Sequence, residues 1–503
     1  MINLNQKIAG LSPAKRALLE ARLIKKALPE NSAKIAAPRN IEVPELSFAQ
    51  QSLWFLDRLE PNSSFYSIPQ AFRISGPVNI EALRKSFETI INRHEVLRTQ
   101  IIDNGGNPKP RVVESVTFEL PLIDLSQFLE HDQHTKTREL INAEAKHPFD
   151  LENDLMLRAG LLLLGKHEHI LLLTVHHIAS DLWSFSVLYR ELAALYRAFG
   201  EQNSSPLPEL KNQYSNFARA QRDFLEGENF GKQLEYWKMR LDGGLPELEL
   251  PADFPRPKTQ SFQGGRKYIR VPLALTVQLK TLSQREGVTP YITLLAAFQT
   301  LLHRYSDQTD VIIGSPLGGR SQIETEQLIG YFLNTLVLRT DLSGDPNFRE
   351  VLQRSRDVVL GAFANQEIPF EKLVDELRVP RNTQRNPIFQ SIFQFQPGPL
   401  PTLQLHQTKT ELLELENGTS KMDLIFTLAE NEHGLSGNLE YNTDLFEGET
   451  IERMLRQYGR LLEGIVENPE QKISRLNLWS EAERRQVLVD WNQTATDYPL
   501  DKC

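Results

Sequence analysis

The apolar residues of this chain alternate between short continuous runs and helical periodicity. Residues 156–164 and 169–175 are apolar runs of strand length, and the intervening Gly165-Lys166 turn predicts a β-hairpin. From residue 184 to 200 the apolar residues instead recur at every third or fourth position, as on one face of a helix. Such alternation is typical of an α/β fold.

A second series of the same kind follows. Residues 266–272 indicate a strand, 290–306 a helix and 310–316 another strand that ends at Gly-Ser-Pro. Residues 451–465 indicate one more amphipathic helix near the end. A chain of 503 residues is also too long for one simple core. The sequence therefore predicts two α/β units of about 200 residues each.

Linker-like composition divides the chain into four segments. Residues 1–45 indicate a helix that begins near Ser12 and a linker after it. We expect a first lobe at 46–210 and a second lobe at 211–480. Residues 481–503 are interpreted as a further linker.

Composition and charge exclude several classes of function. The net charge of −9 argues against nucleic acid or an anionic membrane as the main partner. No apolar run approaches the length of a membrane span, and the N-terminus has no signal-peptide pattern. The only cysteine, Cys503, can supply neither a disulfide framework nor a cysteine zinc site. We expect a cytoplasmic protein.

The segment His176-His177-Ile178-Ala179-Ser180-Asp181 is the strongest chemical signal. It lies where an apolar strand stops and a helix begins. Strand side chains alternate between faces, so only one of the two histidines should meet a substrate. A histidine of near-neutral pKa can act as general base or orient a nucleophile. The alternative is a pair of partly buried histidines that only cap the strand.

Other chemistries have less support in the sequence. A metal site would need further ligands at a recognisable spacing, and a solvated position explains His167 and His169. Gly318-Gly319-Arg320 lacks the lysine of a phosphate-binding loop, and no Gly-x-Ser-x-Gly elbow is present. We therefore predict no bound metal or nucleotide.

The histidine segment resembles the His-His-x-x-x-Asp signature of condensation domains of nonribosomal peptide synthetases. These domains belong to the chloramphenicol-acetyltransferase-like acyltransferases. Further segments resemble other motifs of the family in the expected order: 47–61, 93–100, 214–224, 329–339, 365–377 and 385–396. The resemblance covers roughly residues 44–480.

This resemblance implies an α/β fold of two chloramphenicol-acetyltransferase-like lobes, arranged as a V-shaped pseudo-dimer with a central tunnel. It implies amide-bond formation between a donor thioester on an upstream carrier protein and the amine on a downstream carrier protein. His177 would face the tunnel and orient or deprotonate that amine, whereas His176 would belong to the scaffold. Asp181 would hold the loop through an arginine that the sequence does not identify.

The family pattern also assigns residues to the tunnel. Leu182, Trp183 and Ser184 follow the motif directly, and Ser315 and Asn334 lie in later motifs. Each has a simpler interpretation: Trp183 as packing, Ser315 as the end of a strand, and Asn334 as a turn residue. Leu182 stands where most members have glycine, which puts an ordinary L-aminoacyl donor in doubt.

Arg93 and Arg98 belong to a motif that is mainly structural in the family, although they could simply mark a solvated helix end. The intact histidine pair argues against the heterocyclising subfamily.

The resemblance extends to partners and cofactors. Substrates would arrive on the phosphopantetheine arms of carrier proteins, and the domain itself would bind no cofactor. Residues 481–503 resemble the segment that leads into an adenylation domain, so we expect a monomeric piece of a larger synthetase. Two alternatives stay open: an acyltransferase that uses a soluble coenzyme A thioester, and a catalytically silent recruitment platform.

Overall fold

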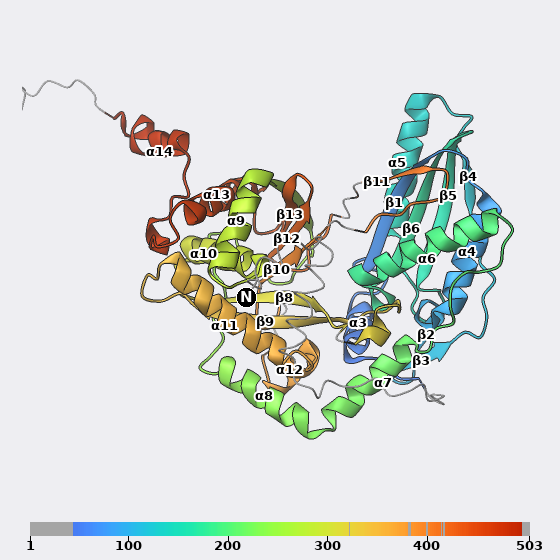
Figure 1. Ribbon diagram of the computed structural model, residues 1–503, viewed down its shortest axis with the longest axis horizontal. Coiled ribbons are helices and arrows are strands. Elements are labelled where there is room, and N and C mark those ends of the chain that lie inside the picture. Colours follow the sequence, from blue (N-terminus) through green and yellow to red (C-terminus); the bar gives the residue numbers. More distant parts are fainter. Residues whose placement is uncertain are drawn as a thin grey trace, which may run out of the picture.

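The computed structural model describes residues 44–494, apart from 321, 381–383, 399–400, 414 and 416–417. The helix expected near Ser12 lies outside the described residues. Two α/β lobes lie next to each other, each built on its own sheet and hydrophobic core (Figure 1). The expected two-lobed α/β fold is confirmed.

A five-stranded sheet forms the first lobe, in the order β11-β1-β6-β5-β4. Neighbouring strands are antiparallel except β4 and β5, which are parallel. The hairpin predicted from the two apolar runs is the β5–β6 pair. The strands are β1 (Ser67–Ser75), β4 (Leu122–Asp124), β5 (Leu157–Gly165), β6 (Glu168–His176) and β11 (Lys409–Leu413).

Helices α4 and α6 of the first lobe pack against each other. The expected cap is present at α4, where the Asn79 side chain accepts a hydrogen bond from the Ala82 amide at 3.0 Å. A small hairpin and a 3₁₀ turn complete the lobe. These elements are α3 (Phe48–Leu59), α4 (Ile80–Arg93), η1 (Glu95–Arg98), β2 (Thr99–Asp103), β3 (Pro108–Val112), α5 (Glu130–Lys146) and α6 (Leu182–Gly200).

The second lobe contains a six-stranded sheet in the order β7-β13-β12-β10-β8-β9. Its central strands β8, β10 and β12 are parallel, and the outer pairs are antiparallel. The strands are β7 (Gly264–Pro272), β8 (Asp310–Gly318), β9 (Leu333–Asp341), β10 (Ser391–Gln396), β12 (Leu424–Asn431) and β13 (Gly434–Asn442).

The helices of the second lobe follow from local signals. Helix α10 has the predicted bounds because Thr289 caps it and Pro290 occupies its first position. The helices are α9 (Leu273–Arg285), α10 (Pro290–Ser306), α11 (Phe348–Ala364), α12 (Phe370–Glu376), α13 (Gly448–Glu467) and α14 (Glu481–Leu488). Helices α7 (Tyr214–Leu225) and α8 (Glu228–Arg240) run between the lobes (Figure 1).

Two segments from the second half of the chain belong structurally to the first lobe. Strand β11 pairs with β1, and Leu328, Ile329 and Phe332 are part of the first lobe's core. A single lobe boundary near residue 210 would have placed both segments in the second lobe. Residues 481–503, expected as a linker, begin with α14, which projects from the second lobe (Figure 1).

Candidate active site

The histidine motif occupies the connection between β6 and α6. Strand β6 ends at His176, and His177 opens a short 3₁₀ turn (η2, His177–Ala179). Asp181 then caps α6, because its carboxylate accepts a hydrogen bond from the Ser184 amide at 2.8 Å. The tight turn and the cap together fix the backbone that presents His177.

The contacts of His177 define its tautomer. Its Nδ1 lies 2.8 Å from the carbonyl oxygen of Ser180. A carbonyl oxygen can only accept, so Nδ1 carries the proton and Nε2 keeps a lone pair. The ring packs edge-on against Tyr331, with 4.8 Å between centroids.

The pKa of His177 supports the same protonation state. Burial lowers this pKa to about 4, and the positive charge of Lys421 adds to the effect. The imidazole is therefore neutral at pH 7, and its Nε2 can take up a proton.

His176 has a different environment. Its side chain is buried between the rings of Tyr66 and Phe149, and its Nδ1 accepts a hydrogen bond from the Ile178 amide at 3.2 Å. Burial lowers its pKa to about 3. This position suits a scaffold residue, as the family pattern implies.

Arg320 is the arginine that the sequence did not identify. Its Nη2 donates to Asp181 Oδ1 at 3.0 Å, and both side chains are almost fully buried. The guanidinium also donates to the carbonyl of Leu328 at 2.7 Å and lies 3.9 Å from the Phe332 ring centroid. Arg320 is the second residue after β8, within Gly318-Gly319-Arg320, a segment that we considered only as a phosphate-binding loop and rejected because it lacks a lysine. No local pattern pairs it with Asp181.

Leu182 and Trp183 are both about half exposed, at 47% and 48%. Trp183 Nε1 donates to the Glu326 carbonyl at 3.0 Å. Neither side chain therefore lies in the lobe core, and packing and the tunnel both stay open as roles for Trp183. Leu182 begins α6 and does not have a positive φ, so a left-handed backbone is not required there.

Ser184 is fully buried rather than open to a tunnel. Its hydroxyl oxygen accepts hydrogen bonds from the Gly330 amide at 3.0 Å and from Arg320 at 2.9 Å. It also lies 2.7 Å from Asp181 Oδ1. Ser184 therefore helps to hold the 320–332 segment against α6.

Asn334 and Ser315 lie within strands β9 and β8, so neither a turn nor a strand end describes them. The Asn334 amide donates to the Gln366 carbonyl at 2.7 Å and the Ile368 carbonyl at 2.8 Å, and its oxygen accepts from the Phe370 amide at 2.9 Å. The buried Ser315 hydroxyl lies 2.6 Å from the Tyr291 hydroxyl.

The two motif arginines make structural contacts. Arg93 pairs with Glu191 at 3.1 Å, and His94 Nε2 lies 2.9 Å from the same carboxylate. Arg98 Nε donates to the Asn92 carbonyl at 3.4 Å, and its Nη1 donates to the Val113 carbonyl. Because Arg93 is mostly buried, a solvated helix end does not describe it.

A pocket of about 810 Å³, part of it open solvent, lies between the lobes. Its lining from the first lobe includes Ser47, the N-cap of α3, and Ala49 within α3. Its lining from the second lobe includes Asn334 and Glu371. Tyr331, which contacts the His177 ring, also belongs to the lining. The pocket is therefore one residue away from His177, although none of residues 176–184 lines it.

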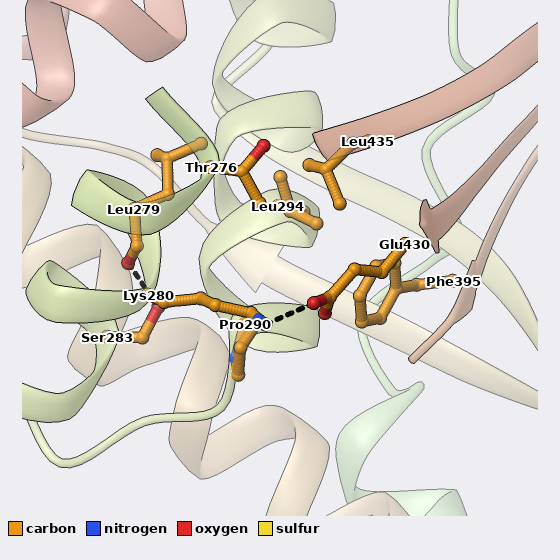
Figure 2. A pocket seen from close by; sticks show the side chains of 9 residues that line it. All are labelled: Thr276, Leu279, Lys280, Ser283, Pro290, Leu294, Phe395, Glu430 and Leu435. Carbon is orange, nitrogen blue, oxygen red and sulfur yellow. Dashed lines mark hydrogen bonds and ion pairs between the residues drawn. The ribbon is translucent and has the colours of Figure 1, made fainter. Parts of the chain in front are cut away.

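A smaller pocket of about 230 Å³, part of it open solvent, lies wholly in the second lobe (Figure 2). Lys280 of α9 extends across it to pair with Glu430 of β12. None of the predicted site residues lines this pocket.

Two searches across the described residues had negative results. Between residues 44 and 494, gaps aside, no three histidine, cysteine, aspartate or glutamate side chains form a group that could hold a metal ion. In the same part of the chain, no helix is both long and apolar enough to cross a membrane.

Two α/β lobes thus meet beside a neutral histidine. The chain belongs to the condensation domain family, because the family model "Condensation domain" matches residues 40–488. The resemblance expected from the motifs is thus confirmed.

Curated relatives of the chain are much longer synthetases. One of the proteins that make up the linear gramicidin synthase of Brevibacillus parabrevis is 44% identical over 471 residues, which is 93% of this chain and 6% of the relative. Phosphinothricin tripeptide synthetase of Streptomyces viridochromogenes is 36% identical over 505 residues, which is 99% of this chain and 46% of the relative. The chain thus spans less than half of either relative.

Solved structures agree with the family assignment. The X-domain from teicoplanin biosynthesis superimposes with a TM-score of 0.81 at 28% identity, covering 88% of this chain and 99% of that one. The first condensation domain of the CDA synthetase, at 19% identity, has the same fold, with a TM-score of 0.73 over 88% of this chain and 100% of that one.

Proposed function

We propose that this chain is the condensation domain of a larger peptide synthetase. It would join a donor acyl thioester on an upstream carrier protein to the amine of an aminoacyl thioester on a downstream carrier protein. The main supporting observation is the His177 tautomer. Its Nδ1 donates a hydrogen bond to the Ser180 carbonyl, which leaves Nε2 able to accept a proton.

In the proposed reaction, the acceptor nitrogen attacks the donor carbonyl carbon and forms the new C–N bond. His177 Nε2 takes the proton that the nitrogen loses. The C–S bond of the donor then breaks, and the thiolate of the phosphopantetheine arm receives a proton. Much of the acceleration would come from tethering both substrates at one site.

The remaining assignments have supporting roles. His176 and the Asp181–Arg320 pair would hold the turn that presents His177. The pocket lined by Asn334 and Tyr331 would admit one phosphopantetheine arm. Leu182, exposed beside the motif, would influence donor choice. An adenylation domain would follow the described part of the chain.

The test uses carrier proteins loaded with a donor and an acceptor, with intact-protein mass spectrometry of the acceptor carrier. We expect His177→Ala to lower condensation by at least about tenfold. The matched control is His167→Ala, because His167 is exposed in the β5–β6 turn. Normal turnover of His177→Ala would contradict the proposed role of His177, and a native chain that condenses no loaded pair would favour the recruitment platform. Equal use of a coenzyme A donor would favour the stand-alone acyltransferase.

A further inference from the structure

Lys421 lies three residues before β12 in the second lobe, on a segment that several hydrogen bonds hold in place. Its carbonyl accepts a hydrogen bond from the Asn386 side chain at 2.8 Å. The preceding Ser420 amide donates to the Phe262 carbonyl at 2.9 Å, and Asp423 pairs with Arg256. These contacts anchor the backbone from which the lysine side chain extends.

The side chain of Lys421 reaches the first lobe. Its Nζ lies 4.4 Å from the ring centroid of Tyr66 and 5.2 Å from that of Phe65, within the range of cation–π interactions. The Tyr66 carbonyl accepts a hydrogen bond from the His177 amide at 2.8 Å. Tyr66 therefore contacts both residues, Lys421 through its ring and His177 through its backbone carbonyl.

Lys421 has no ion-pair partner within 4.0 Å among the described residues, and Glu440, which acts on it at longer range, pairs with Arg266 at 2.8 Å. Lys280 provides a contrast in the same lobe, because its ammonium group pairs with Glu430 at the far end of β12 (Figure 2). The charge of Lys421 is thus not neutralised by an adjacent carboxylate.

We propose that Lys421 is a positioning residue of the His177 site. Its ammonium group, held over Tyr66 by the second lobe, supplies a positive charge that disfavours protonation of the imidazole. His177 then meets the acceptor amine as a neutral base. The role of the imidazole in condensation rests on the proposed function, whereas the charge effect does not.

The electrostatics of the neighbouring groups agree with this role. Burial lowers the pKa of Lys421 to about 8, so the ammonium group stays mostly charged at pH 7. That charge contributes to the low pKa values of both His176 and His177. Asp181 acts on His177 in the opposite direction, and the buried pair with Arg320 offsets its charge.

The other titratable groups near the motif are uncharged or act on different partners. Burial raises the pKa values of the Tyr66 and Tyr331 hydroxyl groups, so both rings stay neutral. Burial also raises the pKa of Glu371, whose charge acts on these two tyrosines. Lys421 is therefore the cation that acts most strongly on His177.

The test measures the titration of His177 by NMR in the full chain, with labelled histidine and the signal assigned from His177→Gln. We expect Lys421→Met to raise the pKa of His177 by about 0.5–1 unit. Lys421→Arg should leave it near the native value, because the charge is kept. Lys280→Met is the matched control and should cause no shift. An unchanged His177 titration in folded Lys421→Met would overturn the proposal; if that variant does not fold, Lys421→Gln serves the same comparison.

The pH dependence of condensation gives the second measurement. For Lys421→Met we expect the acid limb of the rate to move to higher pH, with a relative rate about 1.2- to 1.8-fold lower at pH 5 and little change at pH 8. A purely structural role would lower the rate equally at every pH, which would count against the proposal. If the His177 titration shifts in Lys421→Met but the native chain does not condense loaded carriers, the role of Lys421 is supported and the proposed reaction is rejected.

Discussion

The Asp181–Arg320 pair allows a quantitative prediction. Asp181 Oδ1 accepts from Arg320 at 3.0 Å and from the amide and hydroxyl of Ser184 at 2.8 and 2.7 Å. Its Oδ2 accepts from the Phe332 amide at 3.1 Å. Asp181→Asn keeps the shape of the side chain, but an NH2 donor replaces one carboxylate oxygen and the Arg320 guanidinium loses its counter-charge.

The magnitude follows from burial. Four hydrogen bonds to a charged group, at about 1.5–3 kcal/mol each, would sum to more than 6 kcal/mol, but contacts within one network are not additive. Removing one partner of a buried ion pair costs about 3–5 kcal/mol. If the first lobe, of about 200 residues, unfolds as a unit, at about 2 °C per kcal/mol its Tm should fall by about 6–10 °C. Condensation activity should fall as well, because Asp181 positions the His177 turn.

The assay is denaturant unfolding of the native chain, Asp181→Asn, Arg320→Met and the double variant. We expect the two changes to couple by about 2–3 kcal/mol, because the double variant leaves no unpaired charge. Asp124→Asn is the matched control: Asp124 makes similar contacts to Ser126, at 2.9 and 2.6 Å, but is exposed. A loss below about 1 kcal/mol in Asp181→Asn, or additive losses in the double variant, would refute the reasoning.

Three other predictions follow from the site. Asn334→Ala removes three hydrogen bonds to residues 366–370 and should lower stability by about 1–3 kcal/mol in thermal unfolding, with a higher KM for one carrier-bound substrate. Leu182→Gly should change the product ratio from two competing donors by about 1–3 kcal/mol with little loss of Tm; a lower Tm at an unchanged ratio would contradict this. The folded-state pKa values of His176 and His177, about 3 and about 4, lie below the unfolded value of 6.5, so the unfolded state binds more protons. Stability should therefore fall as pH decreases from about 6.5 to about 4, and His177→Gln should flatten that part of the stability profile in denaturant titrations.

The sequence predicted those elements whose signals are local. Helix α10 matches its expected bounds because a cap and a first-turn proline mark its start. The β5–β6 hairpin was predictable from two apolar runs and the turn between them. Strand β11 was not predicted, because it is a short edge strand whose partner, β1, lies more than 300 residues earlier in the chain.

The candidate site divides in the same way. His176, His177 and Asp181 form one short motif, and its place between a strand and a helix was predictable from the apolar pattern, whereas the Asp181 cap was not predicted. Arg320 and Tyr331 contact that motif only because the fold returns residues about 140–150 positions later to it. The exposure of the Trp183 indole and the burial of the Ser184 hydroxyl were not predictable, since spacing alone does not tell an exposed side chain from a buried one.

The residues from the second half of the chain that act on the histidine motif come from two parts, which are attached differently. The 320–332 segment carries Arg320 and Tyr331, and its Leu328, Ile329 and Phe332 are held in the first lobe's core. Lys421 instead extends from the loop that precedes β12 of the second lobe and contacts the Phe65 and Tyr66 rings of the first lobe. A relative movement of the lobes would therefore change the distance between Lys421 and His177 while leaving the Asp181–Arg320 pair intact. The first lobe and residues 328–332, which pack in its core, therefore set the orientation of the imidazole. Part of the proton affinity of the imidazole depends instead on how close Lys421 of the second lobe lies.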